Sequence, residues 1–217
     1  MPRRQPLLIF AAVAVAALTL VDSAGATITY WLAEPNAALS SALAAPPFGF
    51  VEVTRNNDTN ATVKFVAVDN VDYDYKFGGV NAIALNITGT WTIESINPPP
   101  GDNITETGEQ NVSGFGTFNC TLKNKDGETL SFKWLELTIA ATGETQWLSE
   151  HAVLTTNAAG YVAGAHIFAF PTTDSETKTG FVGDGEIPEP ASMAVWGLGA
   201  CLVGLVGNVR RRSAKRN

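Results

Sequence analysis

The stretch Gly114–Ala140, GFGTFNCTLKNKDGETLSFKWLELTIA, decides the fold class. Its two ends, Gly114–Leu122 and Leu130–Ala140, are rich in Thr, Leu, Ile and aromatic residues, which is typical of β-strands. Between them lies Lys125-Asp126-Gly127, a turn sequence whose glycine tolerates a positive φ. The stretch therefore predicts two strands joined by a tight turn, that is, a β-hairpin.

Strand-like segments also occur on both sides of this stretch, and turn sequences such as Gly78-Gly79 separate them. The predicted strands are Ile28–Leu32, Gly49–Thr54, Thr62–Val68, Val71–Phe77, Asn81–Thr88, Thr90–Ile96, Gly114–Leu122, Leu130–Ala140, Gln146–Thr155 and Val162–Phe170. Only the alanine-rich Asn36–Ala45 indicates a helix; it ends at Pro46-Pro47 and is either a short helix or a loop.

Strands without regular helices between them favour an all-β antiparallel fold over a parallel sheet. We expect residues 27–186 to form an antiparallel β-sandwich, jelly-roll-like in its connections. Its expected core aromatic residues are Phe65, Trp91, Phe115, Phe118, Phe132, Trp134, Phe168 and Phe170.

The charges of the 217-residue chain are unevenly distributed. Seven of the 14 basic residues lie outside residues 27–186, whereas 19 of the 21 acidic residues lie inside, so this middle part carries a net charge of −12. Phosphate backbones repel such a segment, which argues against a nucleic-acid partner. Two cysteines exclude a disulfide-rich scaffold and a four-thiolate zinc site, and two histidines leave little material for metal binding or histidine-based chemistry.

The N-terminus has the organisation of a secretory signal peptide over residues 1–26. Arg3 and Arg4 precede the uncharged run Leu7–Leu20, which as a helix is about 21 Å long and too short for a bilayer core of about 30 Å. Ala24 and Ala26 supply the small residues of a signal peptidase site. We expect the mature chain to start at Thr27; an uncleaved anchor is the alternative.

The C-terminus, residues 187–217, has three parts. Pro188-Glu189-Pro190 is stiff and incompatible with a helix. The uncharged segment 191–209 is about 28 Å long as a helix, which is enough for a single transmembrane helix. The basic cluster Arg210, Arg211 and Arg212 follows, and by the positive-inside rule it stays cytoplasmic while residues 27–186 face outward.

This order of Pro-Glu-Pro, apolar span and arginine cluster resembles the PEP-CTERM sorting signal of bacteria. The resemblance covers about 30 residues at the chain end, and Asn208 between span and cluster is a minor departure. It implies processing near Pro188, Glu189 and Pro190 by exosortase, a membrane-embedded cysteine transpeptidase. It also implies transient anchoring in the inner membrane, then a place at the cell surface or in an exopolysaccharide matrix. A single-span tail anchor is the alternative. A looser resemblance of later segments, such as Gly160–Ile167, to the middle regions of such proteins implies no activity.

Candidate metal ligands are few. Asp69, Asp72 and Asp74 with Asn70 offer the oxygen atoms that calcium prefers, but Lys76 interrupts the EF-hand spacing. The alternative is an amphipathic strand with Val71, Tyr73, Tyr75 and Phe77 inward and Asp72, Asp74 and Lys76 outward. We expect no metal and no cofactor.

Motifs of catalysis are absent from the sequence. There is no G-x-S-x-G, H-E-x-x-H or P-loop sequence, and no pair of carboxylates is singled out for glycoside hydrolysis. Ser149-Glu150-His151 holds the residue types of a hydrolase triad only as sequence neighbours, and His166 shares the strand face of Phe168 and Phe170. Cys120 is expected to be a buried apolar residue.

Two surface features remain open. Trp31, Tyr73, Tyr75, Trp147 and Tyr161 are either core residues or aromatic platforms for sugar rings. Asn-x-Ser/Thr sequences occur at Asn57, Asn60, Asn86, Asn103, Asn111 and Asn119, and chance in a Thr- and Asn-rich chain explains them as well as glycosylation does.

The sequence thus indicates an exported, non-enzymatic surface or matrix protein whose partners are signal peptidase, exosortase and the bacterial inner membrane. A carbohydrate- or calcium-binding module of the matrix, with exopolysaccharide as a partner, is the second hypothesis. A secreted hydrolase is the third.

Overall fold

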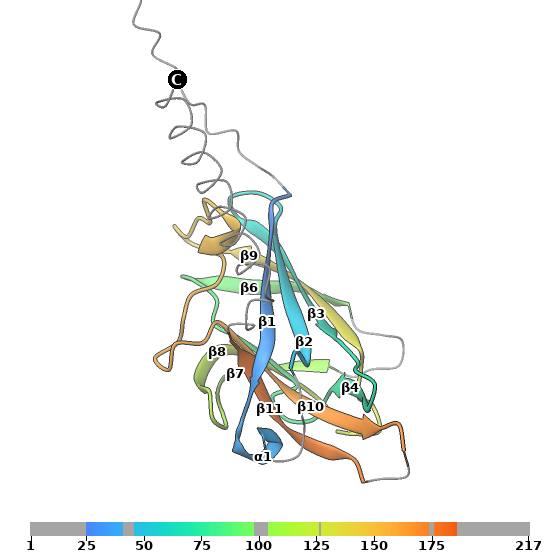
Figure 1. Ribbon diagram of the computed structural model, residues 1–217. Coiled ribbons are helices and arrows are strands. Elements are labelled where there is room, and N and C mark those ends of the chain that lie inside the picture. Colours follow the sequence, from blue (N-terminus) through green and yellow to red (C-terminus); the bar gives the residue numbers. More distant parts are fainter. Residues whose placement is uncertain (1–24, 41–45, 98–103, 126, 174–175, 186–217) are drawn as a thin grey trace, which may run out of the picture.

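The computed structural model describes residues 25–40, 46–97, 104–125, 127–173 and 176–185. Within these residues the chain forms eleven strands, one short α-helix and one 3-10 turn, η1 (Figure 1). The elements are β1 (Thr27–Pro35), α1 (Ala37–Ser40), β2 (Gly49–Arg55), β3 (Asn60–Ala67), β4 (Tyr73–Phe77), β5 (Ile83–Leu85), β6 (Trp91–Asn97), β7 (Ile104–Val112), β8 (Gly116–Asn124), β9 (Trp134–Ala141), η1 (Glu150–Ala152), β10 (Ala163–Pro171) and β11 (Lys178–Asp184). The predicted all-β antiparallel class is confirmed.

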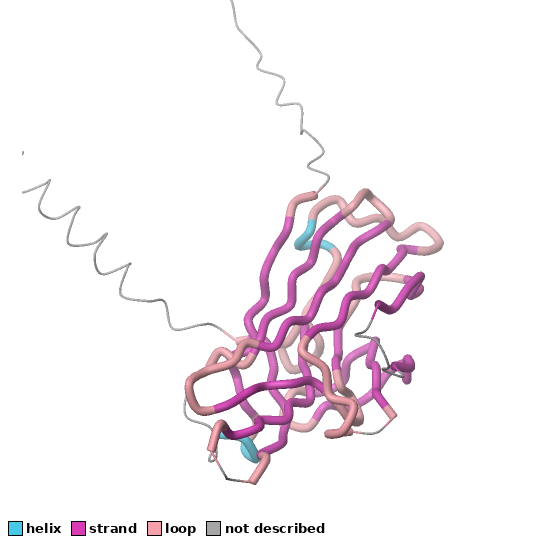
Figure 2. The backbone as a smooth tube through the Cα atoms, turned by 90° about the vertical axis from the view of Figure 1, so that its right-hand side faces the viewer, coloured by secondary structure: helices cyan, strands magenta, loops and turns pink. Residues whose placement is uncertain are grey.

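All strands belong to one antiparallel sheet with the order β6-β9-β3-β2-β1-β11-β10-β5-β8-β7, and β4 pairs with β10 beside this path. The β1–β11 pair joins the two halves, so the sheet is continuous and curled instead of being two separate sheets. Figure 2 shows the long strands lying side by side. This single sheet differs from the expected two-sheet sandwich. The alternation of apolar and polar residues predicts strands, but it does not reveal which strands pair.

The main hydrophobic core lies between the two halves, and a smaller second cluster contains Phe115 and Phe118. Val51, Val63, Phe65 and Leu137 from one half meet Ile83, Leu122 and Ile167 from the other half, and all are completely buried. Five of the expected core aromatic residues are buried: Phe65, Phe115, Phe118, Phe132 and Phe168. Trp91, Trp134 and Phe170 are only partly buried. Trp134 pairs with Val66, whose other neighbour is Phe50, and this row lies on the outer face of the sheet.

The predicted hairpin around Lys125-Asp126-Gly127 is wrong. β8 lies between β5 and β7, whereas β9 lies between β3 and β6. After the turn, Phe132 pairs with Phe77 at the end of β4, with both backbone hydrogen bonds at 2.8 Å. The segment therefore leaves β8 and leads the chain to the other half of the sheet.

Two further differences concern strands. The predicted strand Gln146–Thr155 is mostly η1 and loop, because Trp147 turns inward and its backbone N–H donates to the backbone carbonyl of Asp58 at 2.7 Å. The strands β7 and β11 were not predicted. β7 is an exposed edge strand with Glu106, Glu109 and Gln110, and β11 contains two glycines that lower strand propensity. Within Asn36–Ala45, for which either a short helix or a loop was expected, Ala37–Ser40 form α1.

The glycines of β11 have a packing role. A Cβ atom at Gly180 would lie 2.5 Å from Leu39 Cγ, and one at Gly183 would lie 2.5 Å from Phe115 Cδ1. Both neighbours are buried, so the sheet accepts α1 and the Phe115 turn only where β11 has no side chain.

Candidate functional site

The acidic segment before β4 is organised by Asn70. Its Oδ1 atom accepts the backbone N–H groups of Asp72 at 2.9 Å and Tyr73 at 2.8 Å, which makes a local side-chain turn. Its Nδ2 atom donates to the Tyr75 hydroxyl at 2.8 Å. This turn ends at Tyr73, so β4 starts two residues later than predicted and Val71 lies in the turn with 89% of its surface exposed. The expected inward position of Val71 is therefore wrong.

Within β4 the expected alternation holds. Tyr75 and Phe77 are completely buried, whereas Asp74 and Lys76 are partly exposed on the opposite face. Phe77 packs edge to face with Phe65, and Tyr75 does so with Phe48. The aromatic residues of this segment thus belong to the core, and its charges face solvent.

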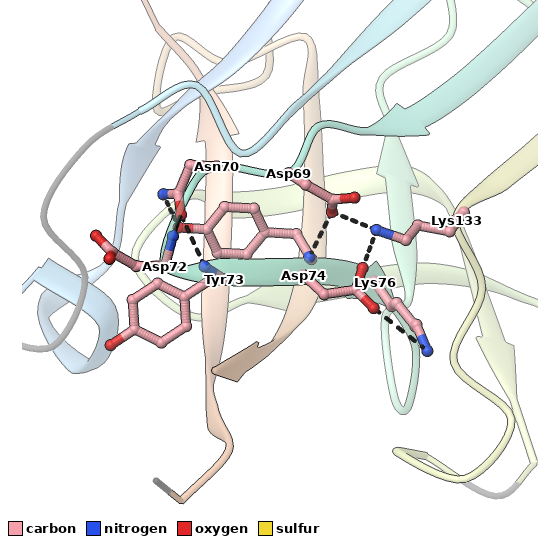
Figure 3. A network of polar contacts seen from close by, with 8 residues as sticks. Asp69, Asn70, Asp72, Tyr73, Asp74, Lys76 and Lys133 are labelled. Carbon is pink, nitrogen blue, oxygen red and sulfur yellow. Dashed lines mark hydrogen bonds and ion pairs between the residues drawn. The ribbon is translucent and has the colours of Figure 1, made fainter. Parts of the chain in front are cut away.

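The carboxylates of Asp69 and Asp74 share one lysine (Figure 3). Lys133 Nζ forms ion pairs with Asp69 Oδ1 and with Asp74 Oδ1. Asp69 also accepts the backbone N–H of Tyr75 at 2.9 Å, and Lys76 Nζ lies 3.8 Å from Asp74 Oδ2. Two lysines therefore balance the charge of Asp69 and Asp74.

This geometry shifts the pKa values of Asp69 and Tyr75 in opposite directions. Partial burial would raise the pKa of Asp69, but the hydrogen bonds from Lys133 and the Tyr75 backbone outweigh it, so the pKa lies below its ordinary value of 3.8. Burial raises the pKa of Tyr75 to about 12 despite the hydrogen bond from Asn70. The Tyr75 hydroxyl therefore stays protonated at neutral pH.

The three candidate metal ligands do not converge. Lys133 occupies the position between Asp69 and Asp74 that a cation would take, and the Asp72 carboxylate points away from both in Figure 3. Among the described residues, no group of three His, Cys, Asp or Glu side chains is arranged to hold a metal ion. We therefore interpret the cluster as an ion-pair network that fixes β4 against the start of β9.

The histidines lie in different surroundings. His151 is exposed on η1, with its Nε2 atom 3.9 Å from the Glu150 carboxylate. His166 on β10 stacks on Phe181 with 4.5 Å between ring centroids and accompanies Phe168, as its strand parity predicted. Its Nε2 atom lies 2.8 Å from Thr179 Oγ1. Burial lowers the pKa of His166, although the backbone of Gly78 and Val80 acts in the opposite direction.

Cys120 is completely buried, as expected. Burial, assisted by the charge of Glu106, raises the pKa of its thiol to about 12. A thiol with this pKa is protonated at neutral pH and is a poor nucleophile.

The candidate sugar-stacking aromatic residues divide into two groups. Trp147 and Tyr75 are completely buried, which confirms the core interpretation for these two. Trp31, Tyr73 and Tyr161 are half-buried and pack on other rings, such as Trp31 against Phe50 with 5.3 Å between ring centroids.

Three Asn-x-Ser/Thr side chains have structural roles. Asn57 Oδ1 accepts the backbone N–H groups of Thr59 and Asn60, both at 2.8 Å. Asn86 donates to the Thr155 carbonyl at 3.2 Å, and Asn119 both donates to and accepts from the backbone of Ile87. Hydrogen bonding thus explains these residues without glycosylation.

One buried ionic centre was not predicted from the sequence. Arg55 is only 2% exposed, donates through Nε to the Trp147 carbonyl at 2.6 Å and pairs with Asp58. Trp147 in turn donates through Nε1 to the Thr88 carbonyl at 3.2 Å. The sequence signal was an arginine at the next inward-facing position of the strand after Val51 and Val53.

The predicted processing residues lie largely outside the described residues. These are Ala24, Pro188, Glu189, Pro190, Arg210, Arg211, Arg212 and the span 191–209. Ala26 is described, and β1 begins at the next residue, Thr27. Over the described ranges, no helix has the length and apolar character needed to span a bilayer.

Comparisons with protein-family models, with curated proteins and with solved structures found no match to this chain.

Proposed function

We propose that the chain is an exported cell-surface or matrix protein, anchored for a time in the inner membrane by its C-terminal segment and processed there by an exosortase. One observation carries the proposal: Pro188-Glu189-Pro190, the uncharged segment 191–209 and the cluster Arg210–Arg212 occur together, in this order. In this proposal the segment 191–209 is a transmembrane helix, and the arginines hold its end in the cytoplasm. The stiff Pro-Glu-Pro peptide then stands just outside the membrane, where an enzyme can bind it in an extended conformation.

The start of the fold supports export. The β1–β2 pairing runs from Thr27–Thr54 to Leu32–Gly49, so it begins at the residue after the proposed cleavage site. Cleavage after Ala26 removes two hydrogen bonds, from Gly25 N–H to the Arg55 carbonyl and from Arg55 N–H to the Ala26 carbonyl. The rest of the ladder is untouched, so the mature chain retains the complete sheet.

We propose a non-enzymatic role for residues 27–186. The side chains that a hydrolase needs are dispersed in the described structure: His166 packs on Phe181, His151 is an exposed neighbour of Glu150, and Cys120 is buried. Lys133 between Asp69 and Asp74 also removes the structural support for the calcium-binding alternative.

The test is maturation of the full chain in a bacterium that contains an exosortase. We expect the wild type to lose both ends and to reach the surface or the medium. The variant Pro188→Ala/Pro190→Ala allows a helix to extend past the membrane, so we expect it to accumulate unprocessed in the membrane fraction. The variant Arg210→Gln/Arg211→Gln/Arg212→Gln is expected to lose retention.

The control is Lys215→Gln/Arg216→Gln, which leaves the arginine cluster intact and is expected to mature normally. Cell fractionation and mass spectrometry of both chain ends give the readout. Normal maturation of the double proline variant, or a cytosolic chain with both ends intact, would contradict the proposal.

A further inference from the structure

An open cleft of about 440 Å³ lies at the end of β8. Its described lining consists of Val80, Thr105, Lys123, Asn124 and Lys125. The β7–β8 register places Thr105 opposite Lys123. Lys125 follows two residues later, and Val80 comes from the loop between β4 and β5. The volume is within the range of small-molecule sites, roughly 300–1,000 Å³.

The buried side chain of Asn124 fixes the floor of this cleft. Asn124 is 3% exposed and accepts the backbone N–H of Gly79 through Oδ1. Its own backbone N–H donates to the Gly79 carbonyl at 3.2 Å, and its Nδ2 atom donates to the Leu130 carbonyl. The end of β8 and the turn after it are thereby held against the Gly79 loop, which is 45 residues away from Asn124, so the cleft has a rigid base.

The two lysines of the cleft differ from most basic residues of the fold. Four of the seven described basic residues form ion pairs: Arg55, Lys76, Lys133 and Lys178. Lys64 has the carboxylate residues Glu52 and Glu136 as its neighbours on the adjacent strands. Lys123 and Lys125 are exposed, and within the described part of the chain neither has a carboxylate at ion-pair distance. Among the residues that the structure describes, the cleft therefore offers two lysines without an ion-pair partner in an acidic domain.

The other lining groups restrict the ligand class. Val80 is 66% exposed, so an apolar surface lies beside the charges, and Thr105 adds a hydroxyl group that donates and accepts hydrogen bonds. The described lining has no arginine for bidentate phosphate binding and no aromatic ring for base stacking. A ligand that combines a carboxylate, hydroxyl groups and a C–H surface fits these groups best.

We propose that this cleft binds a carboxylated sugar, either as a unit of an acidic polysaccharide or as the free sugar acid. Lys123 and Lys125 bind the carboxylate, Thr105 binds a hydroxyl group, and Val80 packs against the ring. The biological use of the site rests on the proposed export of the domain, whereas the binding chemistry rests on the cleft alone.

The test measures binding of the purified full-length protein to polygalacturonic acid and to free galacturonate by titration calorimetry. Neutral dextran and galactose are the matched uncharged probes. We expect binding to polygalacturonic acid that weakens as salt is increased, because the contact is largely electrostatic. Binding of galacturonate as well assigns the site to a single sugar acid, and binding of the polymer alone assigns it to a chain; both results support the proposal.

The variants separate the cleft from overall charge. Lys123→Gln/Lys125→Gln is expected to weaken binding about tenfold or more, which is the loss of about 1.4 kcal/mol or more. Lys64→Gln/Lys178→Gln removes the same charge elsewhere and is expected to stay within about twofold of the wild type, as expected for residues that do not touch the ligand. Val80→Asp adds a negative charge to the cleft and is expected to weaken binding without changing the fold, which circular dichroism checks.

Three results would overturn the proposal: no binding of either acidic probe at low salt, equal binding of neutral dextran, or equal losses in the two lysine pairs. These results are independent of the export test. A chain that matures normally but does not bind removes only the cleft inference. A chain that binds galacturonate but stays in the cytosol removes only the proposed function.

Discussion

The side chain of Asn119 pairs with the backbone of Ile87 as a neighbouring strand would. Ile87 N–H donates to Asn119 Oδ1 at 2.9 Å, and Asn119 Nδ2 donates to the Ile87 carbonyl at 2.7 Å. Ile87 lies just beyond β5, where the β5–β8 ladder has ended at Leu85–Cys120. One amide side chain thus continues the pairing after the two strands diverge.

Replacement of Asn119 by Ala is expected to destabilise the fold by about 1–3 kcal/mol, because Ile87 is 1% exposed and its N–H and carbonyl groups lose their partner. Urea denaturation measures the change. Asn111→Ala is the control, since Asn111 also lies in an Asn-x-Ser/Thr sequence but its side chain is exposed. Equal midpoints for the two variants would show that the Asn119 hydrogen bonds contribute nothing.

At Asp184, burial of the charge and hydrogen bonding have opposite effects on the pKa. Its Oδ1 atom accepts the backbone N–H groups of Val162 and Ala163, both at 2.8 Å. Burial nevertheless raises the pKa of Asp184, assisted by the charge of Glu34 and opposed by these hydrogen bonds. Because the pKa is raised in the folded state, the protonated side chain contributes stability at low pH. This contribution is lost as the pH rises through the folded-state pKa.

The variants Asp184→Asn and Asp184→Ala therefore have opposite expected results. Asn keeps an acceptor oxygen and removes the charge, so at pH 7 this variant is expected to be at least as stable as the wild type. Ala leaves both N–H groups without their acceptor and is expected to cost about 1–3 kcal/mol. Thermal unfolding at pH 7 compares them, and a less stable Asn variant would show that the charge itself is favourable.

The Asp69–Lys133 pair predicts a contribution that disappears in acid. The pKa of Asp69 is lowered in the folded state, so its stabilisation is present above the ordinary value of 3.8 and is lost as the pH falls through the folded-state pKa. Asp69→Asn is expected to cost less than about 1 kcal/mol at pH 6, since both side chains are partly exposed. The difference from the wild type should shrink as the pH falls below 3.8 and should be smallest at the lowest pH measured.

Urea midpoints at pH 6, 4 and 2.5 measure this effect. Asp72→Asn is the matched control, because it removes a neighbouring carboxylate that points away from Lys133. A difference between wild type and Asp69→Asn that is independent of pH would assign the effect to packing instead of charge.

Sequence periodicity was sufficient for the fold class because inward and outward residues alternate clearly in β2, β3 and β9. It failed for β7 and β11 for separate reasons. β7 is an edge strand that needs no apolar face over most of its length, and it carries glutamates that discourage pairing with another chain. β11 needs its glycines because Leu39 and Phe115 lie against it.

Strand pairing was beyond the reach of local patterns. The turn at Lys125–Gly127 has hairpin residues, yet Asn124 and Phe132 bind to the loop and strand around Phe77–Gly79. Such contacts depend on segments about 50 residues away. The candidate site shows the same limit: the composition of the acidic segment 69–74 was evident, but Lys133, which neutralises it, was not. The cleft was equally hidden, because Val80 and Lys125 become neighbours only in the folded chain.

His166 predicts a loss of stability in mildly acidic solution. Burial lowers its pKa below the ordinary value of 6.5, so the folded state binds fewer protons than the unfolded state as the pH falls below that value. The wild type is therefore expected to be less stable at pH 5 than at pH 7.5. His166→Phe keeps a ring beside Phe181 and removes the titration, so its decline over this range should be smaller; an unchanged decline would assign the effect to other groups.

The contact of Gly183 with Phe115 predicts a coupled pair. Gly183→Ala places a methyl group 2.5 Å from the ring of Phe115, which is 1% exposed and has no room to withdraw, so a cost of about 1–3 kcal/mol is expected. Phe115→Leu is expected to destabilise the fold on its own by leaving a cavity. In the double variant the smaller side chain makes room for the methyl group, so the total cost should be clearly below the sum of the two single costs. Urea denaturation of the four proteins measures this coupling, and additive costs would show that β11 does not need glycine to accept the Phe115 turn.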